Sequence, residues 1–203
     1  MGRKQHGKKK IQETFQEQEM REALVRCMYN SRDSSKRFIF EEKLKQDFWL
    51  QYPVERIRTF AEYGSSNIEK IKRKFLCVLS IAIISSWAGL RRFLPVFVNE
   101  DLHDGKLFFD KDQLEHMGDG VEAFLIDQYA FKPAIIGSKQ TKYIQQVESK
   151  YRLPLLDAED CIGSGGFSQV TKAQIAPGGL ELRYDDLSPF RNDKVIVTPP
   201  LFI

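Results

Sequence analysis

Apolar residues recur every three or four positions through much of the first 131 residues, which is the spacing of a helix with one buried face. In the segment 11–29, for example, a stripe is formed by Ile11, Phe15, Leu24 and Met28, with Cys27 beside it. Turn residues such as Pro and Gly separate the periodic segments. The segments predicted to be helical are 11–29, 38–50, 54–63, 67–89 and 121–131.

The segment 67–89 is the most apolar part of the chain. Ser66 and Glu69 have the spacing of a capping box, which predicts the start of a helix here. The residues Phe75–Leu90 then form an uncharged run, and Pro95 argues against an unbroken helix beyond it. A membrane-spanning helix needs about 20 apolar residues, more than this run provides. We therefore predict a helix buried in a helical domain, with a membrane span as the weaker alternative.

The helical periodicity stops near residue 150. Short apolar pieces follow, separated by Pro and Gly, and they are typical of short strands joined by turns. The predicted fold is thus mainly α, with a helical domain followed by a short β hairpin segment (α+β overall). The predicted divisions are a basic arm and first helix at 1–35, a helical domain at 36–150 and the strand segment at 151–203.

The net charge of +3 comes from the N-terminus. Residues 1–10 (MGRKQHGKKK) hold five basic residues and no acid, whereas the remaining chain has 26 basic and 28 acidic residues. A charge run without aromatic residues is typical of a solvated tail, so we do not expect a nucleic-acid partner. The cytoplasm is the predicted location, and the basic arm makes the nucleus the alternative.

Cysteine and histidine are too sparse to suggest a disulfide framework or a zinc site. Cys27, Cys77 and Cys161 are widely spaced, and no histidine lies near them at zinc-ligand spacing. The pattern indicates a reducing compartment and no metal. Among the remaining residues we expect Trp49 and Trp87 in the core, and Asp101 and Asp104 as ordinary loop acids.

One glycine-rich segment carries chemistry. In 162–170 (IGSGGFSQV), Gly163 and Gly165 let the backbone bend tightly and approach a phosphate without a Cβ in the way. Phe167 is placed to close such a hairpin, and Val170 to begin the return strand and face an adenine ring. A Walker A loop is excluded because no Lys follows the glycines. A Rossmann loop fits poorly because Asp and Glu, rather than a buried strand, precede them, and a hairpin without any ligand stays open.

The segment resembles the glycine-rich loop of protein kinases, G-x-G-x-x-G-x-V. Gly163, Gly165 and Val170 match the pattern, and Ser168 replaces its third glycine. Over roughly residues 70–180 the order of segments is similar to a set of fungal kinase-like proteins, in which a helical region precedes the kinase N-lobe. The matching stretches are 74–90, 128–134 (QYAFKPA), 153–155 (LPL), 165–172 (GGFSQVTK) and 175–177 (IAP). The resemblance implies Ser/Thr kinase ancestry and contacts with ATP from Ile162, Gly163, Ser164, Gly165, Gly166, Phe167 and Val170.

The same resemblance implies catalytic groups that these 203 residues do not supply. A kinase holds the ATP phosphates with a lysine on the third strand, and Thr198 takes that place in the comparable stretch VIVT. Neither H-R-D nor D-F-G occurs, so we assign no catalytic residue, and we expect Mg²⁺ only in an intact family member. We therefore expect an incompetent N-terminal fragment of a kinase-like protein, either a truncated gene product or a degenerate paralogue. The alternative is a non-enzymatic helical module that binds a protein partner and retains the hairpin as a relic.

Overall fold

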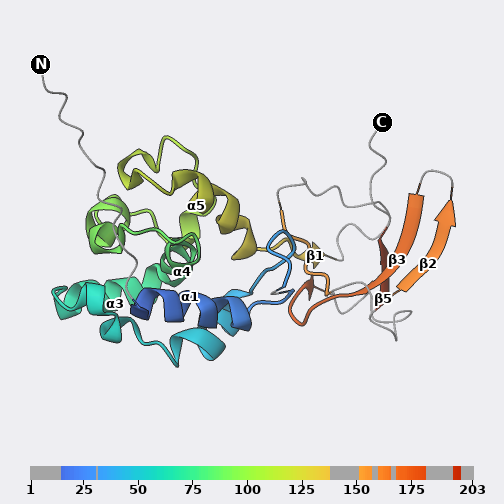
Figure 1. The fold of residues 1–203 in the computed structure, drawn as a ribbon, viewed down its shortest axis with the longest axis horizontal. Helices are drawn as coiled ribbons and strands as arrows, with labels where there is room; N and C mark the ends of the chain where they lie inside the picture. Colours follow the sequence, from blue (N-terminus) through green and yellow to red (C-terminus); the bar gives the residue numbers. More distant parts are fainter. Residues whose placement is uncertain are drawn as a thin grey trace, which may run out of the picture.

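The computed structural model describes residues 15–30, 32–137, 151–156, 160–165, 168–181 and 194–197 of the 203-residue chain. Figure 1 shows the helices gathered on one side of the molecule and the strands on the other. Helices make up most of the described elements, so the prediction of a mainly helical protein is confirmed. The predicted basic arm lies outside the described residues.

Helix α4 (Leu76–Ile84) forms the centre of the helical region. All nine of its residues are buried, because the helix has no polar face to turn toward solvent. Its neighbours are α1 (Phe15–Cys27), α3 (Ser65–Lys74) and α5 (Val121–Asp127), which contact it from different sides. The prediction of a buried helix in this run is confirmed. Within the described part of the chain, no helix is long and apolar enough to cross a membrane.

The predicted continuous helix over 67–89 is wrong, because the chain breaks between α3 and α4. Phe75 leaves the helical conformation, with φ −131° and ψ 16°, and a new helix starts after it. The carboxylate of Asp104 accepts hydrogen bonds from the backbone N–H groups of Cys77 (3.1 Å) and Val78 (2.9 Å). It therefore satisfies two of the first-turn donors that a helix leaves without partners.

The predicted capping box at the start of α3 is also wrong. The helix begins two residues earlier than expected, at Ser65, with Gly64 at the N-cap position and no side-chain cap. The backbone N–H groups of Asn67 and Ile68 bond to the carbonyl of Gly64. Glu69 instead pairs with Lys72 at 2.9 Å, so its carboxylate is directed along the helix surface rather than back to the first turn.

Several predicted helices are realised as short turns of other helical types. Ile57 causes one such change: it is buried and extended, with ψ 112°, so the segment after Pro53 forms two turns instead of one helix. Pro95 falls inside a π-type turn, in agreement with the expected interruption. The remaining helical elements are α2 (Glu41–Lys43), η1 (Leu44–Trp49), η2 (Val54–Arg56), η3 (Arg58–Phe60), η4 (Leu90–Arg92), η5 (Leu94–Val98), η6 (Asp104–Lys106), η7 (Glu115–Met117) and η8 (Gln128–Ala130).

A chain of aromatic rings connects these turns through the core. The ring of Phe93 lies 5.7 Å from Phe60 and 5.0 Å from Phe97, measured between centroids. Phe97 in turn stacks on Phe124 of α5 at 5.4 Å. All four rings are almost completely buried, so they fix the irregular turns against α5 through packing rather than through regular backbone hydrogen bonds.

Both tryptophans lie in the core, as predicted, and each indole N–H finds an acceptor. Trp49 donates to the hydroxyl of Ser80 in α4 (3.1 Å), and Trp87 donates to the carbonyl of Met117 (3.2 Å). The Ser80 hydroxyl in turn donates a hydrogen bond to the carbonyl of Leu76 at 2.7 Å. The hydroxyl of Ser80 is thus the acceptor that allows the Trp49 indole to be buried beside an otherwise apolar helix.

The strands form two small sheets. β2 (Asp160–Gly165), β3 (Ser168–Gln174) and β5 (Lys194–Val197) pair antiparallel in the order β2-β3-β5. β1 (Ile136–Gly137) and β4 (Leu180–Glu181) form a parallel pair. The predicted boundary near residue 150 lies outside the described residues. The N–H of Ala134 bonds to the carbonyl of Arg152, so the end of the helical region contacts the segment that precedes β2.

The contact between Trp49 and Ser80 generates a stability prediction. The variant Ser80→Ala leaves the buried indole N–H without an acceptor, which we expect to lower the free energy of unfolding by about 1–3 kcal/mol. The matched control is Ser85→Ala, because the Ser85 hydroxyl bonds only to carbonyls of its own helix. We expect that change to stay within about 0.5 kcal/mol. Urea denaturation measures both, and equal effects would contradict the role of Ser80.

Candidate functional site

The glycine-rich segment lies on two antiparallel strands. Gly163 is opposite Val170, Ser164 is opposite Gln169, and Gly165 is opposite Ser168. The register shifts between Cys161 and Gly163, so Ile162 lies at an irregularity of the strand. Two of the predicted site residues, Gly166 and Phe167, connect the strands and lie outside the described residues. The pairing brings the others together at one end of β2 and β3.

The third strand, β5, pairs with β3 through its backbone. No lysine of β5 stands at the position that the kinase pattern predicts. Val197 is opposite Thr171 of β3, and Lys194 is opposite Gln174 at the far end of the pairing. Thr198, the residue in the place of the kinase lysine, lies outside the described residues. Lys172 is paired on both sides, with Asp160 and with Ile196, so it belongs to the central strand.

A separate cavity of about 510 Å³ opens in the helical region, where the starts of α2, α4 and η6 meet residues 131–135. Apolar side chains, among them Phe40, Leu107 and Phe131, line much of it. Its charged residues are basic and acidic in equal number: Arg73, Lys74 and Lys132 against Glu41, Glu42 and Asp104. The sequence pattern did not indicate this cavity, because its walls come from segments as far apart in the chain as Phe40 and Ile135.

Asp104 is an acidic group of the cavity whose pKa is strongly perturbed. Burial raises its pKa to about 6, although the N–H groups of Val78 and Cys77 favour the charged form. Sequence reasoning gave this residue no role beyond an ordinary loop acid, and that interpretation is wrong, because its carboxylate caps α4. No local signal identifies such a cap, since the acid and the amides it bonds to are 26 and 27 residues apart.

The cavity has few groups free for chemistry. Burial raises the pKa of the Cys77 thiol well above its ordinary value, so this thiol stays protonated and is a poor nucleophile. Glu41 pairs with Lys45, and Nδ1 of His103 accepts a hydrogen bond from the N–H of Gly105. Across the described ranges, no three His, Cys, Asp or Glu residues come together as metal ligands. Within the described residues, the cavity therefore combines apolar walls and charged side chains with a protonated thiol and no assembled metal site.

Comparison with known proteins gives no relative for either site. No protein-family model matches the chain, no curated protein is significantly similar to it, and no solved structure significantly matches its fold. Its function is therefore inferred from the residues and their arrangement.

The raised pKa of Asp104 generates a pH prediction. The folded state favours the protonated carboxyl, so its contribution to stability is complete below the ordinary pKa of 3.8 and is lost as the pH rises through about 6. The loss amounts to about 3 kcal/mol at most. The variant Asp104→Asn keeps an amide oxygen as acceptor and does not titrate, so the wild type should lose stability relative to it between pH 4 and 7. Urea denaturation across that range checks the difference.

Asp101 provides the control with the opposite sign. The hydrogen bond from Lys106 lowers the pKa of this exposed carboxyl, so its contribution is present above the ordinary pKa and is lost as the pH falls. The variant Asp101→Asn retains a residue that tolerates the local φ of 55°. Parallel pH profiles for the wild type and Asp104→Asn would contradict the assignment for Asp104.

Proposed function

We propose that the strand segment is the start of a protein-kinase-like N-lobe, and that the turn between β2 and β3 covers the phosphates of ATP. The antiparallel pairing of a glycine-bearing strand with its return strand carries this proposal. Gly163 and Gly165 lie on the strand that leads into the turn, and Val170 lies opposite Gly163. A backbone without β-carbons at these positions lets N–H groups come close to phosphate oxygens.

The order of the strands adds support. In the kinase N-lobe the glycine-rich loop joins two antiparallel strands, and a third strand follows with the lysine that holds the phosphates. Here β5 pairs antiparallel with β3 on the side away from β2. The 203 residues contain neither H-R-D nor D-F-G, so the proposal assigns nucleotide contact to this segment and does not assign phosphoryl transfer or a Mg²⁺ site. Cys27 and Cys77 are free thiols, which agrees with a cytoplasmic location.

A second candidate function is a helical module that binds a protein partner and no nucleotide. The cavity of about 510 Å³ in the helical region is the observation in its favour. Arg73 and Lys74 lie at its edge, and neither forms an ion pair with another described residue. The two candidates differ in whether Mg-ATP binds to the chain, so one titration separates them.

Nucleotide binding is the direct test of the proposal. We expect Mg-ATP to raise the melting temperature by several degrees, because a ligand at 100 times its Kd stabilises the folded state by about 2.7 kcal/mol. The variants Gly163→Val and Gly165→Val should abolish this shift. Valine suits a β-strand, so the strand pairing should survive while the branched side chain blocks the phosphates.

The matched control is Gly64→Val in the helical region. A β-carbon at Gly64 meets no atom within 4 Å. The substitution therefore shows what a glycine-to-valine change does when it lies outside the glycine-rich turn. It should leave the nucleotide-dependent shift intact. If the wild type shows no shift at millimolar Mg-ATP, the nucleotide proposal falls and the helical binding module is left.

A further inference from the structure

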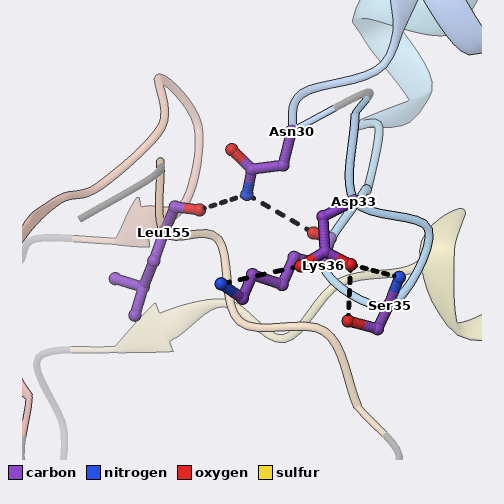
Figure 2. Close-up of polar contacts among 5 residues, drawn as sticks. All are labelled: Asn30, Asp33, Ser35, Lys36 and Leu155. Atoms are coloured by element: carbon purple, nitrogen blue, oxygen red, sulfur yellow. Dashed lines mark hydrogen bonds and ion pairs between the residues drawn. The ribbon is translucent and has the colours of Figure 1, made fainter. Parts of the chain in front are cut away.

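The turn between Tyr29 and Phe38 projects from the helical region toward the strands. The backbones of these two residues bond to each other, with Tyr29 N–H donating at 2.9 Å and Phe38 N–H at 3.3 Å. Inside the turn, the carboxylate of Asp33 accepts from the N–H (2.8 Å) and the hydroxyl (2.6 Å) of Ser35. Figure 2 shows these bonds holding the tip of the turn. The turn is therefore a preformed structure.

Asn30 presents its side chain from this turn to the strand segment. Its Nδ2 donates to the carbonyl of Leu155 at 2.7 Å, across 125 residues of sequence, and more weakly to the carbonyl of Lys36 at 3.4 Å (Figure 2). Asn30 has φ 50°, in the left-handed region that Asn adopts more readily than most residues. Both its backbone conformation and its amide thus suit this position.

The carbonyl of Leu155 can accept a hydrogen bond from Asn30 because of the way residues 154–156 pair with residues 174–176. Leu156 N–H bonds to the carbonyl of Gln174, and Ala176 N–H bonds to the carbonyl of Pro154, both at 2.8 Å. Leu155 and Ile175 face each other between these bonds. In an antiparallel ladder the polar groups of such a residue point to the opposite edge, where Asn30 supplies the donor.

Residues 174–176 are joined along the chain to β3, which forms one arm of the glycine-rich turn. Ile175 follows the last residue of β3, and Val170 lies five residues earlier on the same strand, about 17 Å away at strand spacing. A second contact lies beyond β3, where Ile136 of β1, directly after the helical region, is opposite Leu180 of β4 in a parallel pair. The helical region therefore contacts the strand segment both before β2 and after β3.

We propose that the Asn30 turn docks the helical region onto residues 154–156 and, through their pairing with 174–176, holds the two arms of the glycine-rich turn in place. The docking follows from contacts between described residues, and its consequence for nucleotide binding rests on the function proposed above. Asn30 is in this view a positioning residue for the turn. It makes no contact with nucleotide itself.

Hydrogen exchange on the full chain without nucleotide tests the docking. The variant Asn30→Asp keeps the size and the tolerance for left-handed backbone but replaces the donor with an acceptor that repels the Leu155 carbonyl. We expect exchange roughly fivefold faster or more at the amides of Leu156 and Ala176, the effect of losing one hydrogen bond. The paired amides of β2 and β3 should also exchange faster, and the Leu79 amide in α4 should not change.

Two further variants separate positioning from a general loss of structure. Asn30→His also tolerates left-handed backbone and has a ring N–H donor, so it should recover part of the protection. Ser35→Ala removes a bond in the same turn away from the Leu155 contact and should leave exchange at Leu156 unchanged. Equal effects of Ser35→Ala and Asn30→Asp would overturn the role of the amide.

Each remaining outcome decides the docking proposal or the nucleotide proposal separately. Unchanged exchange at Leu156 and Ala176 in Asn30→Asp would overturn the docking. Faster exchange there, but not in β2 and β3, would overturn the transmission to the glycine-rich turn. Faster exchange at both places in a protein that binds no Mg-ATP would support the docking and reject the nucleotide function.

Discussion

The burial of α4 on every side is the constraint on which the helical region depends. A helix without a polar face must be covered by other elements, and its first-turn N–H groups must find acceptors inside the protein. The carboxylate of Asp104 meets the second requirement at Cys77 and Val78. The burial that makes α4 stable also removes this carboxylate from water and raises its pKa to about 6. Core formation and the unusual titration of Asp104 therefore have the same cause.

The elements predicted best from sequence are those whose structure is decided locally. The apolar stripe on α1 and the apolar run of α4 correctly predicted α-helices. The spacing of apolar residues and the length of an apolar run depend directly on which side chains are buried. The break at Phe75 and the extended Ile57 were not predictable, because each depends on a distant partner: Asp104 for the first and the surrounding core for the second. Local propensity is weak where tertiary contacts supply most of the free energy.

The same division applies to the candidate sites. The glycine-rich turn was found from sequence because its chemistry lies in nine consecutive residues, 162–170. The cavity beside Asp104 and the contact of Asn30 with Leu155 combine residues far apart in the chain. Nothing in the sequence around Asn30 indicates a hydrogen bond to Leu155, which lies 125 positions further along the chain. Its positive φ becomes informative only together with the partner that its amide meets.

The contact between the helices and the strands has an energetic reason. Ala173, Ile175 and Ala176 are buried in the described part of the strand segment, and they lie outside the main hydrophobic core. An isolated hairpin is marginally stable on its own and gains stability when it packs against another part of the protein. The hydrogen bonds from Asn30 to Leu155 and from Ala134 to Arg152 join it to a region with a large aromatic core. We therefore expect the position of the glycine-rich turn to depend on the helical region as well as on its own strands.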